Sequence, residues 1–392
     1  MRGHAASERC RMKVLFDATS AVRRHGGLGR YAEELARAMV AFDSGVELGL
    51  FYTGPAGQAI DPPLDTLPRR SLRLSTKSWR MAALASSYTH IPLDPVLGNA
   101  DVFHATEHLL PYLHRIRSVF TLHDLAFLRC PEAHLPLNRW YLSLMMPRFL
   151  RRADAVICVS QYTKADAVRI YDLEESKLVV IPEGVNPRFH PVESPELLAA
   201  VQARYGLPER FILFVGTIEP RKNLSALWEA YRALHSEGRP EKIVIVGKRG
   251  WLYRATFQRL RELGLEGQVV VLGYVADQDL PAIYSLAGCF AFPSLFEGFG
   301  LPPLEAMACG CPVVCSNASS LPEVCADAAL LVPPTDVAAL TSALRRLLDD
   351  ADLRADLRAR GLRRASNFTW QMAAESTLAV YRVVADGSCA HK

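Results

Sequence analysis

Two glutamates eight residues apart give the sequence its most distinctive motif, Glu297-x7-Glu305, which reads EGFGLPPLEAMACG. It follows an apolar run at 289–294 that we expect to be a strand, and its two prolines mark the start of a helix. Glu297 then lies in a glycine-containing loop, and Glu305 lies in the first helical turn, where capping is its alternative role. The loop also exposes the amides of Phe299, Gly300 and Leu301. Two carboxylates beside a row of amides suit the hydroxyls of a sugar and of a ribose.

Two cations stand at a second helix start. The apolar run at 211–217 predicts a strand, which passes through Gly216 into Arg221-Lys222-Asn223. Asn223 is a candidate N-cap, and free helix amides next to Arg221 and Lys222 would favour an anion. We therefore predict a diphosphate site at this strand end, with a solvated Arg-Lys pair as the alternative.

A histidine and a glycine-rich turn complete the candidate site. The predicted strand 118–123 ends in His123-Asp124, so His123 either hydrogen-bonds near a reacting carbon or is a core histidine paired with Asp124. The predicted strand 13–18 leads into Gly26-Gly27-x-Gly29, which either brings amides to a phosphate or forms a plain tight turn.

Several other chemistries find no support in the sequence. The glycine-rich turn is not a G-x-G-x-x-G dinucleotide fingerprint, and no G-x-S-x-G motif of a serine hydrolase is present. The spacing of Cys309, Cys311 and Cys315 matches no common zinc site. Cys158, Cys289 and Cys315 lie in apolar runs and are expected to be buried, reduced thiols.

Apolar runs alternate with amphipathic helical runs along the whole chain. The expected strands are 13–18, 46–52, 101–106, 118–123, 154–160, 177–182, 211–217, 242–247, 268–273, 289–294 and 312–317. Helices are expected at 29–42, 223–236, 253–263 and 278–287. Most of the strands are apolar throughout, which is typical of parallel strands covered on both faces.

The alternation breaks once, at the proline-rich segment 186–195. We predict an α/β protein with two doubly wound, Rossmann-like domains, at 12–190 and 196–369, that hold a ligand in the cleft between them. A last helix at 370–386 is long enough to cross back to the first domain.

The net charge is +4, and the excess lies in the first half of the chain. No acidic residue stands between Asp65 and Asp94, where five cations fall: Arg69, Arg70, Arg73, Lys77 and Arg80. A second basic stretch, 139–152, is interleaved with aromatic residues and methionines. Both indicate an anionic membrane surface rather than nucleic acid, with an ordinary basic-edged helix as the alternative for 139–152. The sequence shows no spanning segment and no signal peptide, and residues 1–11 are read as an extension before Met12.

Taken together, these motifs resemble those of the retaining glycosyltransferases of family 4, which have the GT-B fold. The resemblance runs from Lys13 to Val384, and Glu297-x7-Glu305 is its most specific part. The other matching motifs are Gly26-Gly27-x-Gly29, His123-Asp124, Glu183-Gly184-Val185 and Gly216-x5-Lys222-Asn223.

The resemblance implies a role for each site residue. Arg221 and Lys222 would hold the donor diphosphate, and the Gly26-Gly27 loop would close over it. Glu297 would bind the donor sugar beside the amides of Phe299, Gly300 and Leu301, Glu305 the ribose, and His123 would lie near the reacting carbon. The base would lie near Gly247-Lys248 and Gly273-Tyr274-Val275. Retention would follow front-face attack, with the diphosphate as the base for the incoming hydroxyl.

The resemblance also implies a nucleotide-sugar donor and no metal. The string Asp277-Gln278-Asp279 resembles a cation-binding motif of other glycosyltransferases, but a helix cap at Asp277 with Asp279 in the first turn explains it. GTIEPRKN and GKRGW are similar to the mannosyltransferase branch, which implies GDP-mannose, with UDP-sugars as the alternative. The acceptor would be a saccharide or a lipid-linked saccharide, and the enzyme would be cytoplasmic, at the inner membrane face.

Three rival interpretations remain. The first is a non-catalytic nucleotide-sugar-binding protein on the same scaffold. The second is a nicotinamide-dependent oxidoreductase, which lacks its fingerprint here. The third is a phosphorylase or synthase acting on storage glucan, which shares the fold but is usually longer.

Overall fold

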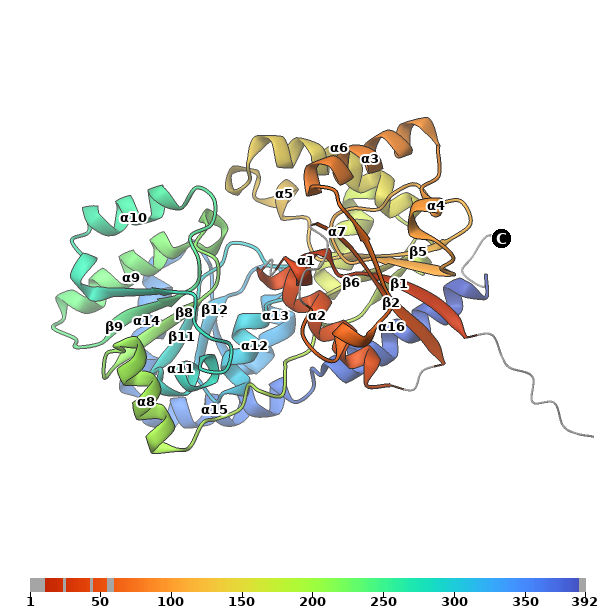
Figure 1. Cartoon of the computed structure of the whole chain (residues 1–392). Helices are drawn as coiled ribbons and strands as arrows, with labels where there is room; N and C mark the ends of the chain where they lie inside the picture. The colour runs from red at the N-terminus through yellow and green to blue at the C-terminus, as the bar shows by residue number, and fades with distance from the viewer. Residues whose placement is uncertain (1–10, 24–25, 43–44, 55–59, 388–392) are drawn as a thin grey trace, which may run out of the picture.

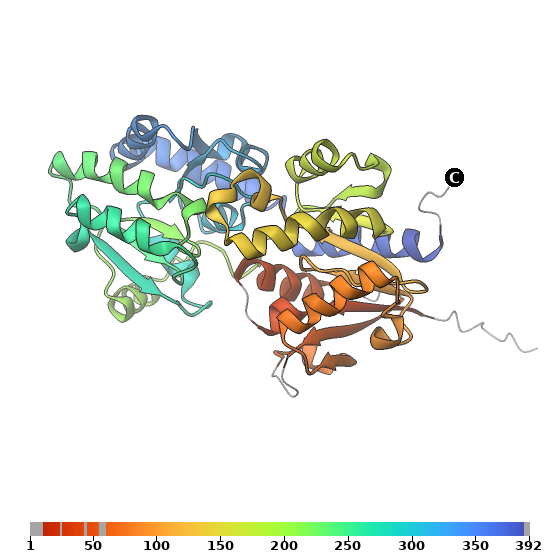
Figure 2. The same ribbon diagram turned by 90° about the horizontal axis from the view of Figure 1, so that it is seen from above.

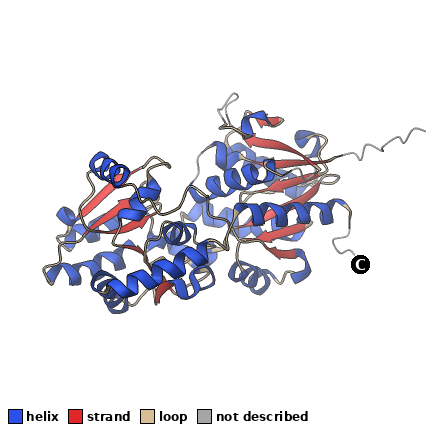
Figure 3. Cartoon of the chain, turned by 90° about the horizontal axis from the view of Figure 1, so that it is seen from below, coloured by secondary structure: helices blue, strands red, loops and turns tan. Residues whose placement is uncertain are grey.

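Two parallel sheets, each covered by helices on both faces, make up the molecule (Figures 1 and 3). The computed structural model describes residues 11–387 except 24–25, 43–44 and 55–59, so nearly all of the expected extension lies outside the described residues. The expected α/β class with two Rossmann-like units is confirmed. The residue boundaries of the domains stay a prediction.

The first sheet has seven strands in the order β3-β2-β1-β4-β5-β6-β7. The strands are β1 (Met12–Asp17), β2 (Val46–Thr53), β3 (Arg69–Leu72), β4 (Val102–Ala105), β5 (Arg117–Leu122), β6 (Ala155–Cys158) and β7 (Leu178–Val180). The helices that accompany them are α1 (Thr19–Val22), α2 (Gly26–Val40), α3 (Thr76–Thr89), α4 (Asp94–Leu97), α5 (Ala126–Arg129), α6 (Pro136–Arg152) and α7 (Gln161–Tyr171).

The second sheet has six strands in the order β10-β9-β8-β11-β12-β13. Its strands are β8 (Phe211–Val215), β9 (Lys242–Val246), β10 (Val269–Gly273), β11 (Cys289–Phe292), β12 (Val313–Ser316) and β13 (Ala329–Val332). The remaining helices are α8 (Pro195–Tyr205), α9 (Leu224–Ser236), α10 (Tyr253–Glu262), α11 (Leu280–Leu286), α12 (Leu301–Ala308), α13 (Leu321–Cys325), α14 (Val337–Asp349), α15 (Ala351–Ala365) and α16 (Trp370–Ala385).

Two strands, β3 and β13, were not expected. Each forms one edge of its sheet and pairs with a single neighbour. β3 reads RRSL and is mostly exposed, so it lacks the apolar run by which a central strand is recognised. The central strands β5, β8 and β11 are buried nearly throughout, as expected for parallel strands.

The chain crosses between the two sheets twice, and the crossings lie side by side. Val185 forms a parallel bridge with Thr369, and its amide donates to the carbonyl of Phe368. A Cβ on Gly184 would lie 2.1 Å from the amide nitrogen of Trp370, so only glycine fits there.

Helix α16 returns to the first sheet, as the sequence predicts. It packs on α2 and contacts β4, β5 and β6. Its Tyr381 hydroxyl lies 2.6 Å from His104 Nδ1, and His104 Nε2 lies 2.7 Å from the Thr121 hydroxyl. These buried polar groups satisfy one another, which fixes the helix to the first sheet.

Three further sequence expectations concern helices and thiols. Helix α2 begins at Gly26 rather than Gly29, so the expected glycine loop is the first turn of the helix. The seven cysteines in the described part of the chain are free and buried. Within that part, no helix combines the length and the apolar character needed to cross a bilayer.

Candidate active site

Three neighbouring strands of the second sheet end in glycines that bring their backbones close together. Gly216 follows β8 with φ 154°, and Gly247 follows β9 with φ 147°. A Cβ on Gly247 would lie 2.0 Å from the carbonyl oxygen of Gly216, and the Gly247 amide donates to Gly273 at 2.8 Å. The close approach requires glycine and leaves the strand ends as bare backbone.

The next two residues expected near the base, Lys248 and Tyr274, lie at the same edge. The carbonyl of Lys248 accepts the Ile218 amide at 2.9 Å, which joins this loop to the one after β8. The Tyr274 side chain is 77% exposed, so it is not packed against the other site residues.

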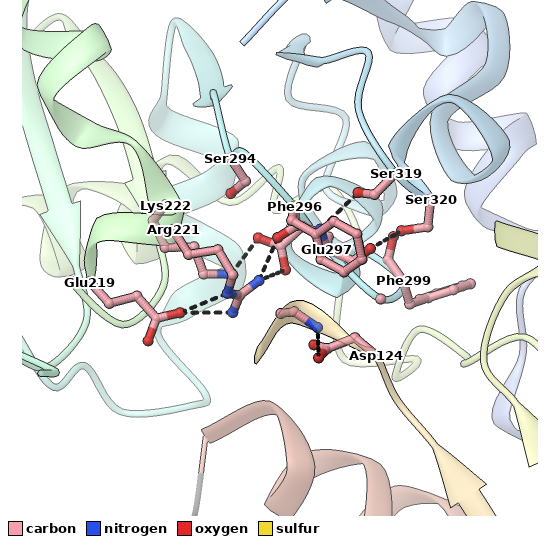
Figure 4. A network of polar contacts seen from close by, with 12 residues as sticks. Asp124, Glu219, Arg221, Lys222, Ser294, Phe296, Glu297, Phe299, Ser319 and Ser320 are labelled. Carbon is pink, nitrogen blue, oxygen red and sulfur yellow. Dashed lines mark hydrogen bonds and ion pairs between the residues drawn. The ribbon is translucent and has the colours of Figure 1, made fainter. Parts of the chain in front are cut away.

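A buried cluster of two cations and two carboxylates follows β8 and β11 (Figure 4). Arg221 and Lys222 lie in a 3₁₀ turn, Pro220–Lys222, and both reach the Glu297 carboxylate. Arg221 Nη1 lies 2.8 Å from Glu297 Oε2, and Lys222 Nζ lies 2.6 Å from Glu297 Oε1. Arg221 also binds Glu219 at 2.8 Å and donates to the Phe296 carbonyl at 2.6 Å. The structure therefore brings Arg221, Lys222 and Glu297 together, as the sequence predicts.

Burial and charge oppose each other in this cluster. Burial alone raises the pKa of Glu297, but Arg221 and Lys222 outweigh it and lower that pKa from 4.5 to about 2. Burial is also the largest influence on Lys222, and it lowers the pKa of the ammonium although Glu297 opposes the shift. The pKa of Arg221 is raised because Glu297 and Glu219 together outweigh burial. Glu297 is thus a carboxylate held between two cations.

Asn223 does not cap helix α9, which corrects the sequence expectation. It stands at the N-cap position with φ 55°, but its side chain makes no capping bond. Its Nδ2 donates instead to the carbonyls of Pro293 at 3.0 Å and Pro334 at 2.8 Å. Asn223 therefore joins the loops after β11 and β13 to the loop that carries the two cations.

The loop 297–301 is held from behind by two serines. The Glu297 amide donates to the Ser319 hydroxyl at 2.7 Å, and the Ser320 hydroxyl donates to the carbonyls of Glu297 at 3.0 Å and Phe299 at 2.6 Å (Figure 4). Gly300, with φ 124°, is the N-cap residue of α12, and Leu301 opens that helix. The two prolines that follow carry no N–H, so the Leu301 amide is the one donor of the three residues that open the helix.

Gly298 brings this loop against the first sheet. A Cβ on Gly298 would lie 1.9 Å from the carbonyl oxygen of His123, and the Ser160 hydroxyl donates to the Gly298 carbonyl at 2.7 Å. Glu297 and His123 therefore face the same boundary between the two units.

His123 is buried, and its partner is Glu183 rather than Asp124. Its Nε2 lies 2.9 Å from the Thr106 carbonyl and therefore donates to it, and Nδ1 lies 3.5 Å from Glu183. Asp124 instead accepts the Ala126 amide at 2.9 Å, at the start of α5. The alternative of a histidine paired with Asp124 is therefore wrong. No role was predicted for Glu183, although the matching motif Glu183-Gly184-Val185 could have indicated that it is a functional residue.

Helix α2, whose first turn carries the glycines of the first unit, contacts His123. The ring of Tyr31, on α2, meets the His123 ring edge-on at 4.7 Å between centroids, so the start of α2 lies next to the histidine. Gly29 is buried, whereas a Cβ on Gly26 or Gly27 would meet nothing within 4 Å. The first turn of α2 is therefore open on the side of these two glycines.

Glu305 lies in the second turn of α12 rather than the expected first turn, and the alternative that it caps the helix is wrong. Its carboxylate forms an ion pair with Arg30 of α2 and accepts the Tyr284 hydroxyl at 3.1 Å. Burial raises the pKa of Glu305 despite Arg30, and Glu305 is the main cause of the raised pKa of Arg30. Sequence reasoning missed Arg30, whose signal was a cation directly after the glycine-rich run.

Asp277 does not cap α11 and Asp279 precedes its first turn, so the predicted cap is also wrong. Asp279 stands at the N-cap position without a capping bond, and Arg204 and the Tyr205 hydroxyl each lie 2.8 Å from its Oδ2. Asp277 pairs with Arg188 at 3.4 Å and with Arg30 at 3.5 Å. Across the described residues, no three His, Cys, Asp or Glu side chains are grouped so as to hold a metal ion.

The second basic stretch is mostly an ordinary amphipathic helix. Helix α6 buries Tyr141, Met145, Met146 and Phe149, and of the aromatic residues and methionines interleaved there only Trp140 is exposed. The buried face matches the alternative stated for 139–152, and Trp140 stays at the surface.

Known proteins identify the class to which this fold and site belong. The family model described as "Glycosyl transferases group 1" matches residues 202–364, and the one described as "Glycosyltransferase Family 4" matches residues 25–189. The chain therefore belongs to the glycosyltransferases of family 4, has the GT-B fold and is an enzyme.

Two relatives that match most of the chain are both named mannosyltransferases. The chain is 32% identical over 383 residues to O-antigen chain mannosyltransferase B of Escherichia coli, covering 95% of this chain and 100% of that one. It is 29% identical to the MMP alpha-(1->4)-mannosyltransferase of Mycolicibacterium hassiacum, covering 91% and 94%.

Solved structures share the fold. Sucrose-phosphate synthase from Thermosynechococcus elongatus superposes with a TM-score of 0.77 at 22% identity, covering 96% of this chain and 100% of that one. Anabaena HepE in complex with UDP and glucose superposes with a TM-score of 0.71 at 21% identity, covering 95% and 99%.

Proposed function

We propose that this glycosyltransferase moves mannose from GDP-mannose to a saccharide or lipid-linked saccharide in polysaccharide biosynthesis, with retention of configuration and without a metal. The observation that carries the proposal is the buried cluster of Arg221, Lys222 and Glu297 at the strand ends. Relatives along most of the chain are named mannosyltransferases, which supports mannose as the transferred sugar.

The cluster suits a leaving diphosphate. Negative charge grows on the diphosphate as the glycosidic bond breaks, so cations already fixed in place stabilise the transition state more than the ground state. Glu219 and Glu297 hold the two cations in position before the donor binds. These two cations neutralise the charge of the leaving diphosphate, as a divalent ion does in a metal-dependent enzyme.

The remaining site residues have roles on the sugar and the nucleoside. Glu297 and the amides of Phe299, Gly300 and Leu301 bind the donor sugar, and Glu305 binds the ribose after exchanging its contact with Arg30. His123, held by Thr106 and Glu183, lies near the reacting carbon, and the departing diphosphate accepts the proton of the incoming hydroxyl. Gly247, Lys248 and the backbone at Tyr274 line the region of the base.

A UDP-sugar donor is the second candidate, and one observation favours it. HepE, which has the same fold, was solved with UDP and glucose. In this chain the bare backbone at Gly216, Gly247 and Gly273 admits a base without a side chain that selects between guanine and uracil.

We further propose that the enzyme is cytoplasmic and works at the inner membrane surface, through the face formed by α3 and α6. The two helices are neighbours (Figure 2), and Arg80 of α3 lies 3.2 Å from Asn138 of α6. Leu137 is 77% exposed and Trp140 is 59% exposed on α6, and Met81 is exposed on α3. Exposed apolar side chains among cations suit an anionic lipid surface.

A thermal-shift screen with GDP, UDP and ADP, each with and without chelator, tests the donor assignment. A ligand at about 100 times its Kd stabilises the folded state by roughly 2.7 kcal/mol, which such a screen resolves. We expect GDP to give the largest shift and the chelator to leave it unchanged. A larger shift with UDP would contradict GDP-mannose as the donor and support a UDP-sugar instead.

A further inference from the structure

A small pocket lies in the first unit, away from the cation cluster. It opens where β1, β2 and β4 end beneath α3, and its chemistry comes from Asp17, Trp79, Arg80, Glu107 and His108, with three threonines. In the sheet order, β1 and β4 are neighbours at which the chain changes direction. Ligands of doubly wound sheets bind at such a switch point.

Three polar atoms of the pocket residues are buried without a hydrogen-bond partner among the described residues: Trp79 Nε1, Glu107 Oε1 and His108 Nε2. The Trp79 side chain is only 4% exposed. A buried polar group without a partner destabilises the fold, so three in one pocket indicate a ligand that supplies the missing partners.

The polar groups of the pocket include both donors and acceptors. Trp79 and Arg80 donate, whereas Asp17 and Glu107 accept, and the threonines do both. Burial raises the pKa of Asp17 to about 6, and burial together with Asp17 raises the pKa of Glu107 to about 7. Burial lowers the pKa of His108 to about 4, so its ring is neutral. Hydroxyl groups match such a mixture, whereas a phosphate would meet two carboxyl groups.

The pocket is adjacent to His123. The rings of His108 and His123 lie 6.1 Å apart between centroids. Thr106 joins the two places, since its carbonyl accepts from His123 Nε2 at 2.9 Å and its hydroxyl donates to the Asp17 carbonyl at 2.5 Å. A molecule anchored in the pocket would extend toward the histidine.

We propose that this pocket binds a hydroxyl group of a neutral acceptor saccharide, through Trp79, Glu107 and His108, and sets the acceptor beside His123. The pocket is narrow, so it takes a hydroxyl or hydroxymethyl group while the sugar ring lies across its mouth. The same carboxyl groups disfavour a phosphorylated sugar at this position. This inference rests on the proposed transferase function and adds the class of its acceptor.

The indole N–H resonance of Trp79 reports directly on the pocket. It is one of five tryptophan signals in the chain and is assigned by its loss in Trp79→Phe. We expect titration with the methyl glycosides of mannose, glucose, galactose and N-acetylglucosamine to shift this signal for at least one of them, and mannose 6-phosphate to leave it in place. A signal unmoved by all four glycosides, or moved equally by mannose 6-phosphate, would overturn the inference.

Kinetics then separates the acceptor from the donor. Glu107→Gln and Trp79→Phe should each raise the KM for the best glycoside at least about tenfold, the loss of one hydrogen bond to a charged or buried group. The slow hydrolysis of the donor without acceptor should be unchanged. Glu47→Gln, on an exposed residue at the opposite end of β2, is the matched control.

The two kinds of failure are distinguishable. A wild-type protein that neither transfers nor hydrolyses any nucleotide sugar would contradict the proposed function. A wild-type protein that transfers, with an unchanged acceptor KM in both variants, would leave the function intact and refute the pocket.

Discussion

Replacing Glu297 with glutamine removes the carboxylate that holds both buried cations. In the wild-type protein one oxygen of Glu297 binds Arg221 and the other binds Lys222. Glutamine has nearly the same shape, so the change removes a charge and leaves the packing of the loop in place. Arg221 keeps Glu219, whereas Lys222 loses its ion pair. We therefore expect a lower free energy of unfolding, mainly because the buried ammonium of Lys222 is left without its ion pair.

The magnitude follows from the pKa of Glu297. Its pKa falls from 4.5 in the unfolded chain to about 2 in the folded state. Because a pKa change by one corresponds to roughly 1.4 kcal/mol, this lowering amounts to about 3 kcal/mol of stabilisation. Breaking a buried ion pair costs a similar 3–5 kcal/mol. Because the folded pKa is the lower one, this stabilisation is full above pH 4.5 and is lost as the pH falls toward 2.

Calorimetric melting at neutral pH measures the effect. A loss of about 3 kcal/mol lowers the Tm of a unit of this size by roughly 6–12 °C. Glu262→Gln, which removes an exposed partner of Arg259, should cost less than about 1 kcal/mol. The double variant Lys222→Met with Glu297→Gln should recover part of the loss, because it leaves no unpaired ammonium. A Glu297→Gln Tm within 2 °C of wild type, as in the exposed control, would refute the reasoning.

Three other outcomes follow from the structure. Arg221→Ala or Lys222→Ala should lower kcat by roughly 10²-fold or more in steady-state assays, whereas Arg232→Ala on the exposed side of α9 should not; wild-type turnover in either variant would contradict the diphosphate site. Gly184→Ala should cost roughly 2 kcal/mol or more by denaturant unfolding, since its Cβ meets the Trp370 backbone, and Gly267→Ala, where a Cβ meets nothing, is the comparison that should stay near wild type. Arg30→Ala should raise the pKa of Glu305 further. As the pH is lowered, the nucleotide affinity measured by calorimetry should therefore begin to fall at a higher pH in this variant than in wild type; identical pH profiles would argue against a role for this pair.

The central strands and the strand-end motifs were predictable because their physics is local. A short, uninterrupted apolar run such as 211–215 that ends at a glycine is typical of a strand covered on both faces, and the glycine directly after it marks a close backbone approach. Arg221, Lys222 and Glu297 met as expected because their loops follow β8 and β11, which are adjacent in the sheet.

What could not be predicted depends on contacts between distant segments. The pairing of Glu305 with Arg30 is set by how the two units meet, and that of His123 with Glu183 by the packing of the loops after β5 and β7 in the first sheet; no spacing in the chain reveals either. Capping was wrongly assigned at Asn223 and Asp277 for the same reason. Each side chain has better partners across the fold than the amides of its own helix.

The sequence also did not predict the cluster of unpartnered polar side chains in the pocket of the first unit. Trp79 lies on α3, and Glu107 and His108 follow β4, so they meet only when the sheet places the end of β4 beside that of β1. The sequence had indicated Arg80 as part of a basic surface, yet the structure places it at this pocket.

The most direct test of the account is the release of nucleoside diphosphate by the purified protein from GDP-mannose, UDP-glucose and ADP-glucose, with saccharide acceptors and an excess of chelator. The account predicts GDP release from GDP-mannose that the chelator leaves unchanged, that Arg221→Ala lowers roughly 10²-fold or more, and that yields an α-linked product by NMR. Release that requires a divalent cation, or that proceeds at the wild-type rate in Arg221→Ala, would contradict the central claim that these two cations carry the leaving diphosphate.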